Sequence, residues 1–518
     1  MHQNKLNLII NRCIAFFVII GIVFSFYNFI CNRSLWADEA LLALNIANKS
    51  WGELLTPLDM NQIAPIGFLM IEKLMVSLLG NHDWVLRLFP FLAFLMSIPL
   101  LISIVKLEFK SDVVAFFSAA IFVLNSSILY YSAELKQYSV DVFVALLILY
   151  SLIKNINLAT QKEVLVTALV GAISIFLSNI AIIILFSSGI YILFIHRNNI
   201  KQFNFFFLMP LLTWLLTFFL YYIQFIRNHP THDFMISYWS ARKAFPTQQL
   251  FSTAFRNFVI SKTQMLFSTF FDYAKTWLIL LVFFACGIFT LFKKKQVLFF
   301  CVTPLLIHFL LSYFRLYPFE TRLVIYLIPM IIVVLSSGFV YTINLIQKKI
   351  TKNIVYVLLI LPLTIMVFLR AQSFPIQKEE LKKSLEFINS NLTDDEQIFV
   401  YYISNPSFNY YKTTYPSISD KPSAVFGNWH IHGCGRSFLL DKNHQPIVIS
   451  EEDLLKTKGK FWLLFSGVPE SDYFKIDGEN EEKHLLNQFL KNKYKILQQQ
   501  SFVGSSCYLI QNATDNQE

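Results

Sequence analysis

The feature that most constrains this chain is a series of apolar runs, most of them about as long as a membrane is thick. A helix needs about 20 apolar residues to cross the hydrocarbon core of a bilayer. Only 15% of the 518 residues are charged, against roughly 25% in soluble proteins, and 55% are hydrophobic. The sequence therefore predicts an α-helical polytopic membrane protein with about eleven transmembrane helices. The expected spans are 8–30, 85–105, 113–130, 139–153, 163–178, 180–195, 204–223, 277–292, 297–314, 322–346 and 353–370.

Basic residues are distributed unequally between these runs. With the N-terminus in the cytosol, the inner segments hold fourteen lysines and arginines, whereas the short outer turns hold Lys136 and Arg315. Cytoplasmic segments of membrane proteins are enriched in basic residues, which supports this orientation. The same bias explains the net charge of +10 without a nucleic-acid partner. The first run has no obvious small-residue cleavage site, so we expect a retained anchor in the cell (inner) membrane.

Three longer segments then lie outside the cytosol. They are a first loop (31–84), a middle loop (224–276) and a tail rich in charge. The tail alternates expected helices (378–391 and 479–494) with expected strands (397–403, 460–467 and 501–511), and Ser450 starts a further helix as its N-cap. We therefore expect a transmembrane domain over 1–374 and a soluble extracytoplasmic α/β domain over 375–518.

Ionisable residues at the outer edge of the spans form three clusters. Polar groups near membrane depth are costly and usually face the interior of a bundle or a cavity. All three clusters fall on the outer side, so the sequence predicts one shared site. The clusters are Asp38 and Glu39 after the first run, Glu134, Lys136 and Asp141 around the turn at 130–138, and Arg315, Glu320 and Arg322 around the turn at 315–321.

These residue types suit transfer of a sugar from a lipid-phosphate donor. A carboxylate near an apolar boundary gains proton affinity and can act as a general base toward an acceptor hydroxyl. Cations at the same level can hold an anionic headgroup and stabilise the departing lipid phosphate.

Each residue also has a structural interpretation. Asp38 is compatible with the N-cap of a helix over 39–47, and Glu134 and Lys136 with an ordinary solvated turn. Asp141 fits a helix-start residue better than a catalytic one, and Arg322 fits an interfacial anchor. The shared outer face of the clusters favours the functional interpretation.

Several motifs resemble those of the GT-C superfamily of integral-membrane glycosyltransferases. The resemblance extends over most of the chain, and it is greatest to bacterial relatives of protein O-mannosyltransferases and lipid A aminoarabinose transferases. The motifs are Trp36-Ala37-Asp38-Glu39-Ala40, Ala64-Pro65-Ile66-Gly67 with Leu79-Gly80 and Leu86-Arg87-Leu88, Ser132-Ala133-Glu134-Leu135-Lys136-Gln137-Tyr138-Ser139, Arg322 with Tyr326 and Pro329, and Tyr401-Tyr402 with Asn405-Pro406 and Tyr410-Tyr411.

The resemblance implies an inverting hexosyl or pentosyl transfer from a polyprenyl-phosphate-linked sugar to an extracytoplasmic lipid, glycan or protein. It implies that Asp38 is the base, with Glu39 beside it and Glu134 orienting donor or acceptor. Lys136, Arg322, Tyr138 and Arg315 are then the candidates for binding the donor phosphate. The chain has Lys136-Gln137-Tyr138 where the superfamily often has Arg-Pro-Tyr. Lysine keeps the positive charge but cannot form the two parallel hydrogen bonds of arginine. This difference affects the identity of the donor sugar and the binding of its phosphate more than the class of reaction.

A few residues of the sequence are candidates for a metal site or a disulfide. His430 and His432 would share one face of a strand and could form a metal pair there, but the nearby Gly427, Gly433 and Gly435 favour a loop. The group His229, His232 and Asp233 fits a segment that covers substrate better than a zinc site. With several cations at hand we expect no obligatory metal, although a divalent cation is compatible with the site. Cys434 and Cys507 can pair if the tail lies outside.

Two other functions use the same features differently. A lipid or glycolipid transporter would hold a headgroup with the same cations but would not need Asp38 as a base. A membrane-anchored binding or scaffold protein would act through its tail and leave the three charged clusters unexplained. Neither sugar nor acceptor follows from the residues.

Overall fold

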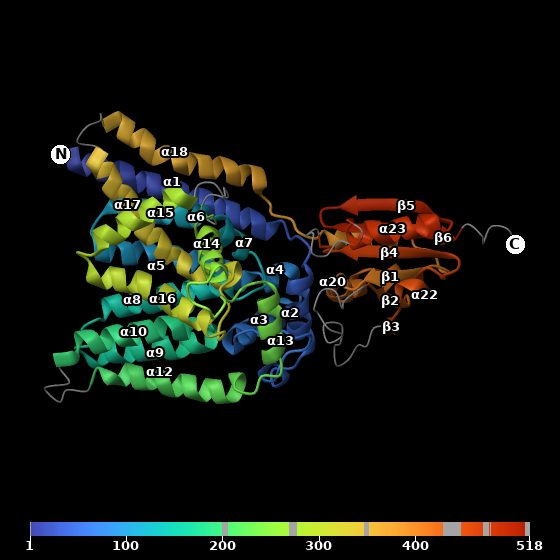
Figure 1. Ribbon diagram of the computed structural model, residues 1–518, viewed down its shortest axis with the longest axis horizontal. Coiled ribbons are helices and arrows are strands. Elements are labelled where there is room, and N and C mark those ends of the chain that lie inside the picture. The colour runs from blue at the N-terminus through green and yellow to red at the C-terminus, as the bar shows by residue number, and fades with distance from the viewer. Residues whose placement is uncertain are drawn as a thin grey trace. The chain divides into compact units, whose positions relative to one another are not determined.

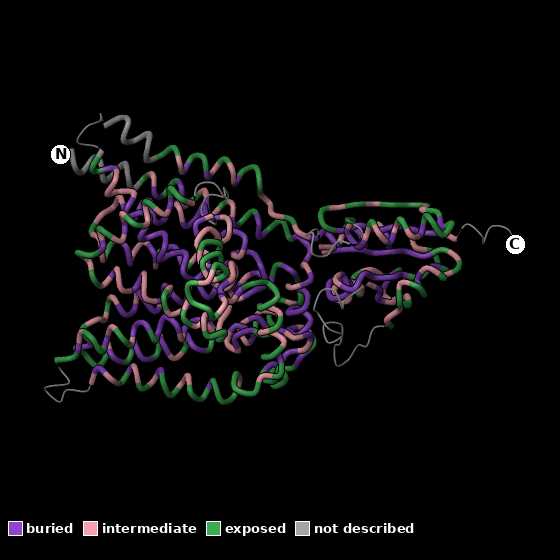
Figure 2. The backbone as a smooth tube through the Cα atoms, in the orientation of Figure 1, coloured by how far each residue is buried: buried purple, intermediate pink, exposed green. Residues whose placement is uncertain are grey.

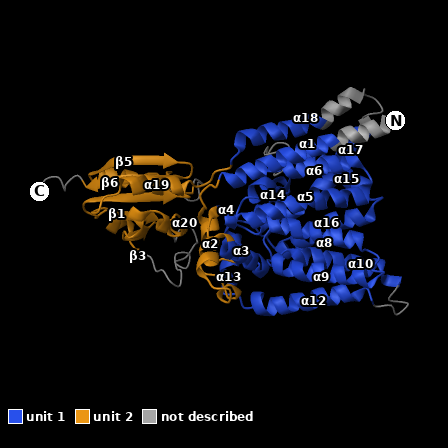
Figure 3. Cartoon of the chain, turned by 180° about the vertical axis from the view of Figure 1, so that it is seen from behind, with its two compact units in different colours: residues 1–31, 64–78, 84–375 blue, residues 32–63, 79–83, 376–518 orange. Residues whose placement is uncertain are grey.

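The computed structural model describes residues 2–198, 206–268, 277–346, 352–427, 447–469, 476 and 478–512, with side chains omitted for 2–11, 346 and 352–359. The chain forms two compact units (Figure 3). Unit 1 contains residues 1–31, 64–78 and 84–375, and unit 2 contains residues 32–63, 79–83 and 376–518. The possible Cys434–Cys507 pair and the His430-Ile431-His432 motif involve positions outside the described residues. The domain boundary expected from the sequence stays a prediction.

Unit 1 is a bundle of helices that run side by side (Figure 1). Every one of the eleven expected spans contains a helix. The helices are α1 (His2–Ile30), α3 (Ile66–Leu79), α4 (Asp83–Leu86), α5 (Leu88–Phe109), α6 (Asp112–Leu124), α7 (Ser126–Tyr131), α8 (Tyr138–Lys154), α9 (Gln161–Leu177), α10 (Ala181–Ile195), α12 (Leu208–Tyr221), η2 (Tyr222–Ile226), α13 (His232–Ala241), α14 (Thr253–Ser268), α15 (Trp277–Leu291), α16 (Lys295–Tyr313), η3 (Thr321–Leu323), η4 (Ile325–Leu327), α17 (Ile328–Ile346) and α18 (Lys352–Ser373).

The predicted class of α-helical polytopic membrane protein is confirmed. Within the described residues, five helical segments are long and apolar enough to cross a membrane, and four more apolar helices are shorter. The five are Arg12–Ile30, Asp83–Phe109, Leu208–Ile226, Lys295–Tyr313 and Ile325–Leu345. Outward sides of α12 and α18 are largely exposed, as expected of a surface that faces lipid (Figure 2). The number of eleven spans stays a prediction.

Small residues bring two of these helices together. α15 packs against α17, and a Cβ atom added at Gly287 or Gly338 would overlap a backbone carbonyl oxygen of the other helix. Close approach through small residues is typical of helix pairs inside a membrane, where apolar side chains gain little by leaving lipid.

One expected span is divided. The segment 113–130 forms α6 and α7, because Asn125 leaves the helical conformation and accepts a hydrogen bond from the backbone N–H of Ile128 at 3.0 Å. An asparagine side chain of this kind starts a new helix. The break positions α7 and the turn at 132–137 that follows it.

Unit 2 is built on a six-stranded mixed sheet with the strand order β3-β2-β1-β4-β6-β5. Strands β3, β2, β1 and β4 are parallel, while β6 pairs antiparallel with both β4 and β5. The strands are β1 (Gln397–Tyr401), β2 (Ser423–Phe426), β3 (Ile447–Val448), β4 (Lys460–Ser466), β5 (Tyr494–Phe502) and β6 (Ser505–Asn512). The helices are α2 (Ala37–Asn48), η1 (Glu53–Leu55), α19 (Leu381–Asn391), α20 (Asn405–Tyr411), η5 (Lys412–Thr414), α21 (Pro416–Ser419), α22 (Glu451–Leu454) and α23 (Glu481–Lys491).

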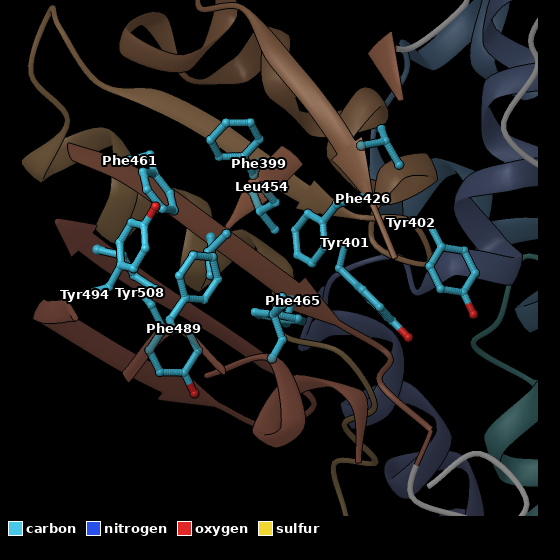
Figure 4. Packing of buried hydrophobic residues seen from close by; sticks show 14 residues of the cluster. Phe399, Tyr401, Tyr402, Phe426, Leu454, Phe461, Phe465, Phe489, Tyr494 and Tyr508 are labelled. Atoms are coloured by element: carbon cyan, nitrogen blue, oxygen red, sulfur yellow. The ribbon is translucent and has the colours of Figure 1, made fainter. Parts of the chain in front are cut away.

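An aromatic core fills one side of this sheet. Phe399 and Tyr401 of β1, Phe461 and Phe465 of β4, and Phe489 of α23 are all buried in one cluster (Figure 4). The predicted α/β organisation of the tail is confirmed, but two expected elements have wrong bounds. The expected strand over 501–511 is divided by a turn at Val503 and Gly504 into the end of β5 and most of β6. The expected helix over 479–494 ends at Lys491, because Lys493 takes a left-handed conformation and β5 begins at Tyr494.

The first loop contributes α2 to unit 2. This helix packs against α20, and Leu41, Leu44, Met60 and Tyr410 form a small apolar cluster. The sequence signals for strands and helices in the tail do not reveal this packing, because it joins segments more than 340 residues apart.

Candidate active site

In unit 1 the turn between α7 and α8, together with the first residue of α8, holds three of the expected site residues. Glu134, Lys136 and Tyr138 are all buried, with exposed fractions of 1%, 7% and 5%. The alternative of an ordinary solvated turn therefore does not apply. A carboxylate and an ammonium at this depth fit a built polar site, since buried charges are costly unless they are compensated.

Neighbouring hydroxyls and rings fix this turn. Ser132 donates to the carbonyl oxygen of Leu129 at 2.7 Å and lies 2.6 Å from the hydroxyl of Ser25 in α1. Ser139 donates to the carbonyl oxygen of Pro90 at 2.9 Å, which ties α8 to α5. Rings of Tyr131 and Tyr138 meet edge to face. The backbone that carries Glu134 and Lys136 is thus held from both sides.

The turn between α16 and α17 holds Glu320 and Arg322. Glu320 accepts hydrogen bonds from Lys262 at 2.9 Å and from the backbone N–H of Thr321 at 3.0 Å. Burial alone would raise the pKa of Glu320, but these two hydrogen bonds and the charge of Lys262 together lower it below its ordinary value. Arg322 lies over the ring of Trp239, 5.0 Å from its centroid. The middle loop therefore holds this turn through α13 and α14.

The two turns of unit 1 lie together. Helix α8 packs against η4. Burial and then the charges of Asp141 and Tyr138 raise the pKa of Tyr317, which places that phenol within electrostatic reach of both groups. The Nδ1 atom of His308 in α16 forms a hydrogen bond with the hydroxyl of Tyr326 at 2.9 Å. Its Nε2 atom forms a hydrogen bond with the carbonyl oxygen of Pro318 at 3.0 Å. Two of the three charged clusters are thus adjacent, and the one site that all three are expected to share stays a prediction.

Other residues of these clusters have defined positions. Asp141 lies in the first turn of α8, where Ser178 donates to its carboxylate at 2.5 Å. This matches the helix-start interpretation. Arg315 is exposed and adopts a left-handed conformation with φ 56°. It is less enclosed than Lys136, and its role in phosphate binding stays a prediction.

The third cluster, Asp38 and Glu39, belongs to unit 2. Asp38 lies within the first turn of α2, while the N-cap position is taken by Trp36, whose side chain makes no capping bond. The N-cap interpretation of Asp38 is therefore wrong, and its carboxylate is half-buried. Glu39 is fully buried and pairs with Arg33 at 3.9 Å. A carboxylate in a first turn is stabilised by the helix dipole.

Residues of the tail hold the segment that leads into α2. The hydroxyl of Tyr411 accepts from the backbone N–H of Leu35 at 2.7 Å and donates to Asp83 at 2.7 Å. Asp83 also accepts from Lys382 at 2.9 Å. Ser407 donates to the carbonyl oxygen of Leu35 at 3.0 Å. These contacts fix residue 35 on both sides of its backbone, only three residues before Asp38.

The sequence does not single out Glu379, Lys382 or Trp239. Glu379 accepts from the backbone N–H of Ala37 at 3.2 Å, at the start of α2. Nothing in the local pattern distinguishes Glu379 from Glu380, because the partner lies in the first loop. Tyr411 belongs to the motif Tyr410-Tyr411, but its hydrogen bond to Leu35 follows only from the fold.

Metal-ligating residues do not gather in the part of the chain that the structure describes. No group of three or more His, Cys, Asp or Glu side chains there is placed to hold a metal ion. His232 pairs with Asp233 at 3.2 Å on an exposed surface, and burial lowers the pKa of His229. The expectation that no metal is obligatory stays a prediction.

Two solved structures match this architecture over nearly the whole chain. ArnT from Cupriavidus metallidurans bound to undecaprenyl phosphate is 10% identical, with a TM-score of 0.56 over 96% of this chain and 97% of that one. The apo state of the same protein is 9% identical, with a TM-score of 0.54 over 98% of both chains. The chain shares the ArnT fold. No protein-family model matches it. No curated protein sequence matches it.

The likeness to ArnT shows that the chain has the fold of that protein. Because identity is so low, the likeness shows how the chain folds and not what it transfers. The site residues are therefore assigned from the burial and contacts described above.

Proposed function

We propose that this protein is an inverting glycosyltransferase that moves a sugar from a polyprenyl-phosphate carrier to an acceptor outside the cytosol. The observation that carries the proposal is the buried turn with Glu134, Lys136 and Tyr138, packed beside the Arg322 turn, in a chain with the ArnT fold. The ArnT structure holds undecaprenyl phosphate. A lipid phosphate at this turn would meet buried cationic and phenolic donors suited to it.

The proposed reaction is a single displacement. Asp38 takes the proton of the acceptor hydroxyl, and the oxygen attacks the anomeric carbon of the donor sugar from the face opposite the phosphate. The bond between that carbon and the phosphate oxygen breaks, and the polyprenyl phosphate leaves with its electron pair. Lys136 and Arg322 stabilise the charge that develops on the phosphate, while Glu134 orients a sugar hydroxyl. This mechanism requires that Asp38 and the two turns face one substrate.

The setting follows from the same proposal. The protein would lie in the inner membrane with several spans, and unit 2 would lie on the extracytoplasmic side together with Asp38. Basic side chains would hold the phosphate without an obligatory metal. Acceptors of the lipid, glycan and protein classes are distinguished by the experiment below.

The test is glycan and lipid profiling of membranes from cells that lack the chain, complemented with wild type, Asp38→Asn or Asp59→Asn. Asp59 is the matched control, because it is an acid of the same loop whose carboxylate pairs with Lys49 at 3.1 Å. We expect one glycosylated species to disappear and its lipid-linked sugar to accumulate. Wild type and Asp59→Asn should restore the profile, while Asp38→Asn should fall short by roughly 100-fold or more.

A full rescue by Asp38→Asn would contradict the base assignment. The lipid or glycolipid transporter would then be the better function, since it needs the cations but no base. Loss of rescue with Lys136→Met, with the lipid-linked sugar accumulating again, would support the donor-phosphate role of that lysine.

A further inference from the structure

Glu379 replaces the missing cap of helix α2. The first backbone N–H groups of a helix have no partner within the helix. Trp36 at the N-cap position provides no side-chain bond, and Glu379 instead accepts from the backbone N–H of Ala37 at 3.2 Å. The same carboxylate oxygen accepts from the hydroxyl of Ser466 at the end of β4, also at 3.2 Å. One side chain therefore joins the sheet of unit 2 to the first turn of α2.

The neighbourhood of Glu379 is closely packed. Its carboxyl is buried, and a Cβ atom added at Gly467 would lie 2.7 Å from its second oxygen. Gly467 has φ 68°, so the chain turns tightly at this point. Lys378 places its ammonium 3.5 Å from the centroid of the Trp36 ring. Two consecutive tail residues thus hold the two residues that precede Asp38.

Glu379 is also coupled to Asp38 by charge. Burial raises the pKa of Glu379 to about 7, the bonds from Ala37 and Ser466 and the charge of Lys378 oppose this, and the charge of Asp38 adds to it. Among the described residues, Asp38 and Lys378 are the charged groups that act on this carboxyl. Coupling between two titrating sites is reciprocal. An ionised Glu379 therefore makes Asp38 a stronger base.

We propose that Glu379 is a positioning residue for sugar transfer, which fixes the first turn of α2 and, through its charge, tunes the basicity of Asp38. The inference rests on the proposed function, because it requires that Asp38 is the base. Glu379 itself does not touch substrate in this account. It acts through the backbone of Ala37 and through the field at Asp38.

Two substitutions separate the two parts of this role. Glu379→Gln keeps an oxygen that can accept from Ala37 but cannot ionise. Glu379→Leu removes both the acceptor and the charge. Glu380→Gln is the matched control, because Glu380 is the adjacent buried acid and pairs with Lys383 at 3.2 Å. The assay follows transfer by the purified full-length chain, with the polyprenyl-phosphate sugar that accumulates in cells lacking it as donor.

We expect the kcat of wild type and of Glu380→Gln to rise with pH through an inflection near 7, where Glu379 ionises. Glu379→Gln should keep kcat within about threefold of wild type at low pH and lose the inflection. Glu379→Leu should lower kcat on the order of 10- to 100-fold at every pH, with the donor KM unchanged, because a displacement near 1 Å at a reacting group has this effect.

An unchanged kcat in Glu379→Leu, or a retained inflection in Glu379→Gln, would overturn the inference. Failure of the proposed function is a different result, because the purified wild-type chain would then transfer no sugar. Failure of the base assignment alone would leave transfer by Asp38→Asn at the wild-type rate. Glu379→Gln preserves volume and hydrogen bonding, so the inference stays testable even if Glu379→Leu does not fold.

Discussion

Glu379→Gln should make unit 2 more stable at neutral and alkaline pH. The pKa of Glu379 is about 7 in the folded chain, against 4.5 for an ordinary glutamate. The folded state therefore binds this proton more tightly than the unfolded state. Its contribution to stability is complete below pH 4.5 and is lost as the pH rises to about 7. At about 1.4 kcal/mol per pK unit, the loss is about 3 kcal/mol.

Glutamine has no proton to lose, so the difference in stability between Glu379→Gln and wild type should grow by about 3 kcal/mol between pH 4.5 and pH 7. Unit 2 has the size of a domain that shifts its Tm by roughly 2–4 °C per kcal/mol, which gives a relative gain of about 6–12 °C. The assay is thermal unfolding of both full-length variants in detergent at several pH values. A Tm difference that stays constant across this range would refute the pKa argument.

Three further substitutions test contacts that the structure shows. Trp462→Phe removes the bond that the buried indole donates to Glu396 at 2.9 Å, and should lower the free energy of unfolding of unit 2 by about 1–3 kcal/mol in denaturant titrations. Trp239→Leu removes the ring under Arg322 and should raise the donor KM by about 2- to 30-fold with a smaller change in kcat. Gly171→Leu would drive a side chain into the indole that packs against it from α12, so the yield of monodisperse protein in detergent should fall; wild-type yield would show that α9 and α12 can separate at that point.

The helices of unit 1 could be predicted because apolar length is a property of each segment alone. All eleven expected spans coincide with helices, and the errors are local. Asn125 divides one span, and the segment before α17 winds into η3 and η4 instead of continuing the helix to residue 322. α3 was missed within the first loop, because its apolar stretch is shorter than a span and reads as part of a loop.

In the tail, strands with continuous apolar runs were the easiest to predict. β1 and β4 match their expected ranges closely, since both are buried on two faces and carry long hydrophobic stretches. β5 is an edge strand with many polar residues. Its sequence therefore lacks a continuous apolar run, and its first residue falls within the expected helix over 479–494. Short strands such as β2 carry too few residues for a period to show.

The residue types of the candidate site could be predicted from the sequence, but the residues that hold them in place could not. Glu134 and Lys136 are buried, as expected of ionisable residues at membrane depth, which usually face the interior of the bundle and belong to a functional site. The groups that hold Asp38 come from the tail, and no spacing rule connects positions 37 and 379. Their hydrogen bond exists only because α2 joins the sheet unit.

Tyr411 of the tail also holds the segment that leads to Asp38. Its hydroxyl is the partner of the Leu35 backbone N–H, and Leu35 is fully buried. In Tyr411→Phe that N–H loses its acceptor, and Asp83 loses one of its two donors. A buried donor without a partner costs about 1–3 kcal/mol, and the segment that leads to Asp38 would relax to find another. Tyr411→Phe should therefore lower both Tm and kcat, although the hydroxyl lies on a different segment from the proposed base.

Tyr410→Phe is the matched control. Its hydroxyl donates to Asn81 at 3.1 Å in an exposed hydrogen bond, where water can replace the lost partner. The two neighbouring tyrosines thus lose the same atom in different surroundings. If the first loop alone placed Asp38, both variants would keep wild-type kcat. A loss confined to Tyr411→Phe would mean that the tail takes part in transfer by fixing the approach to α2, which is also what the contact between Glu379 and Ala37 implies.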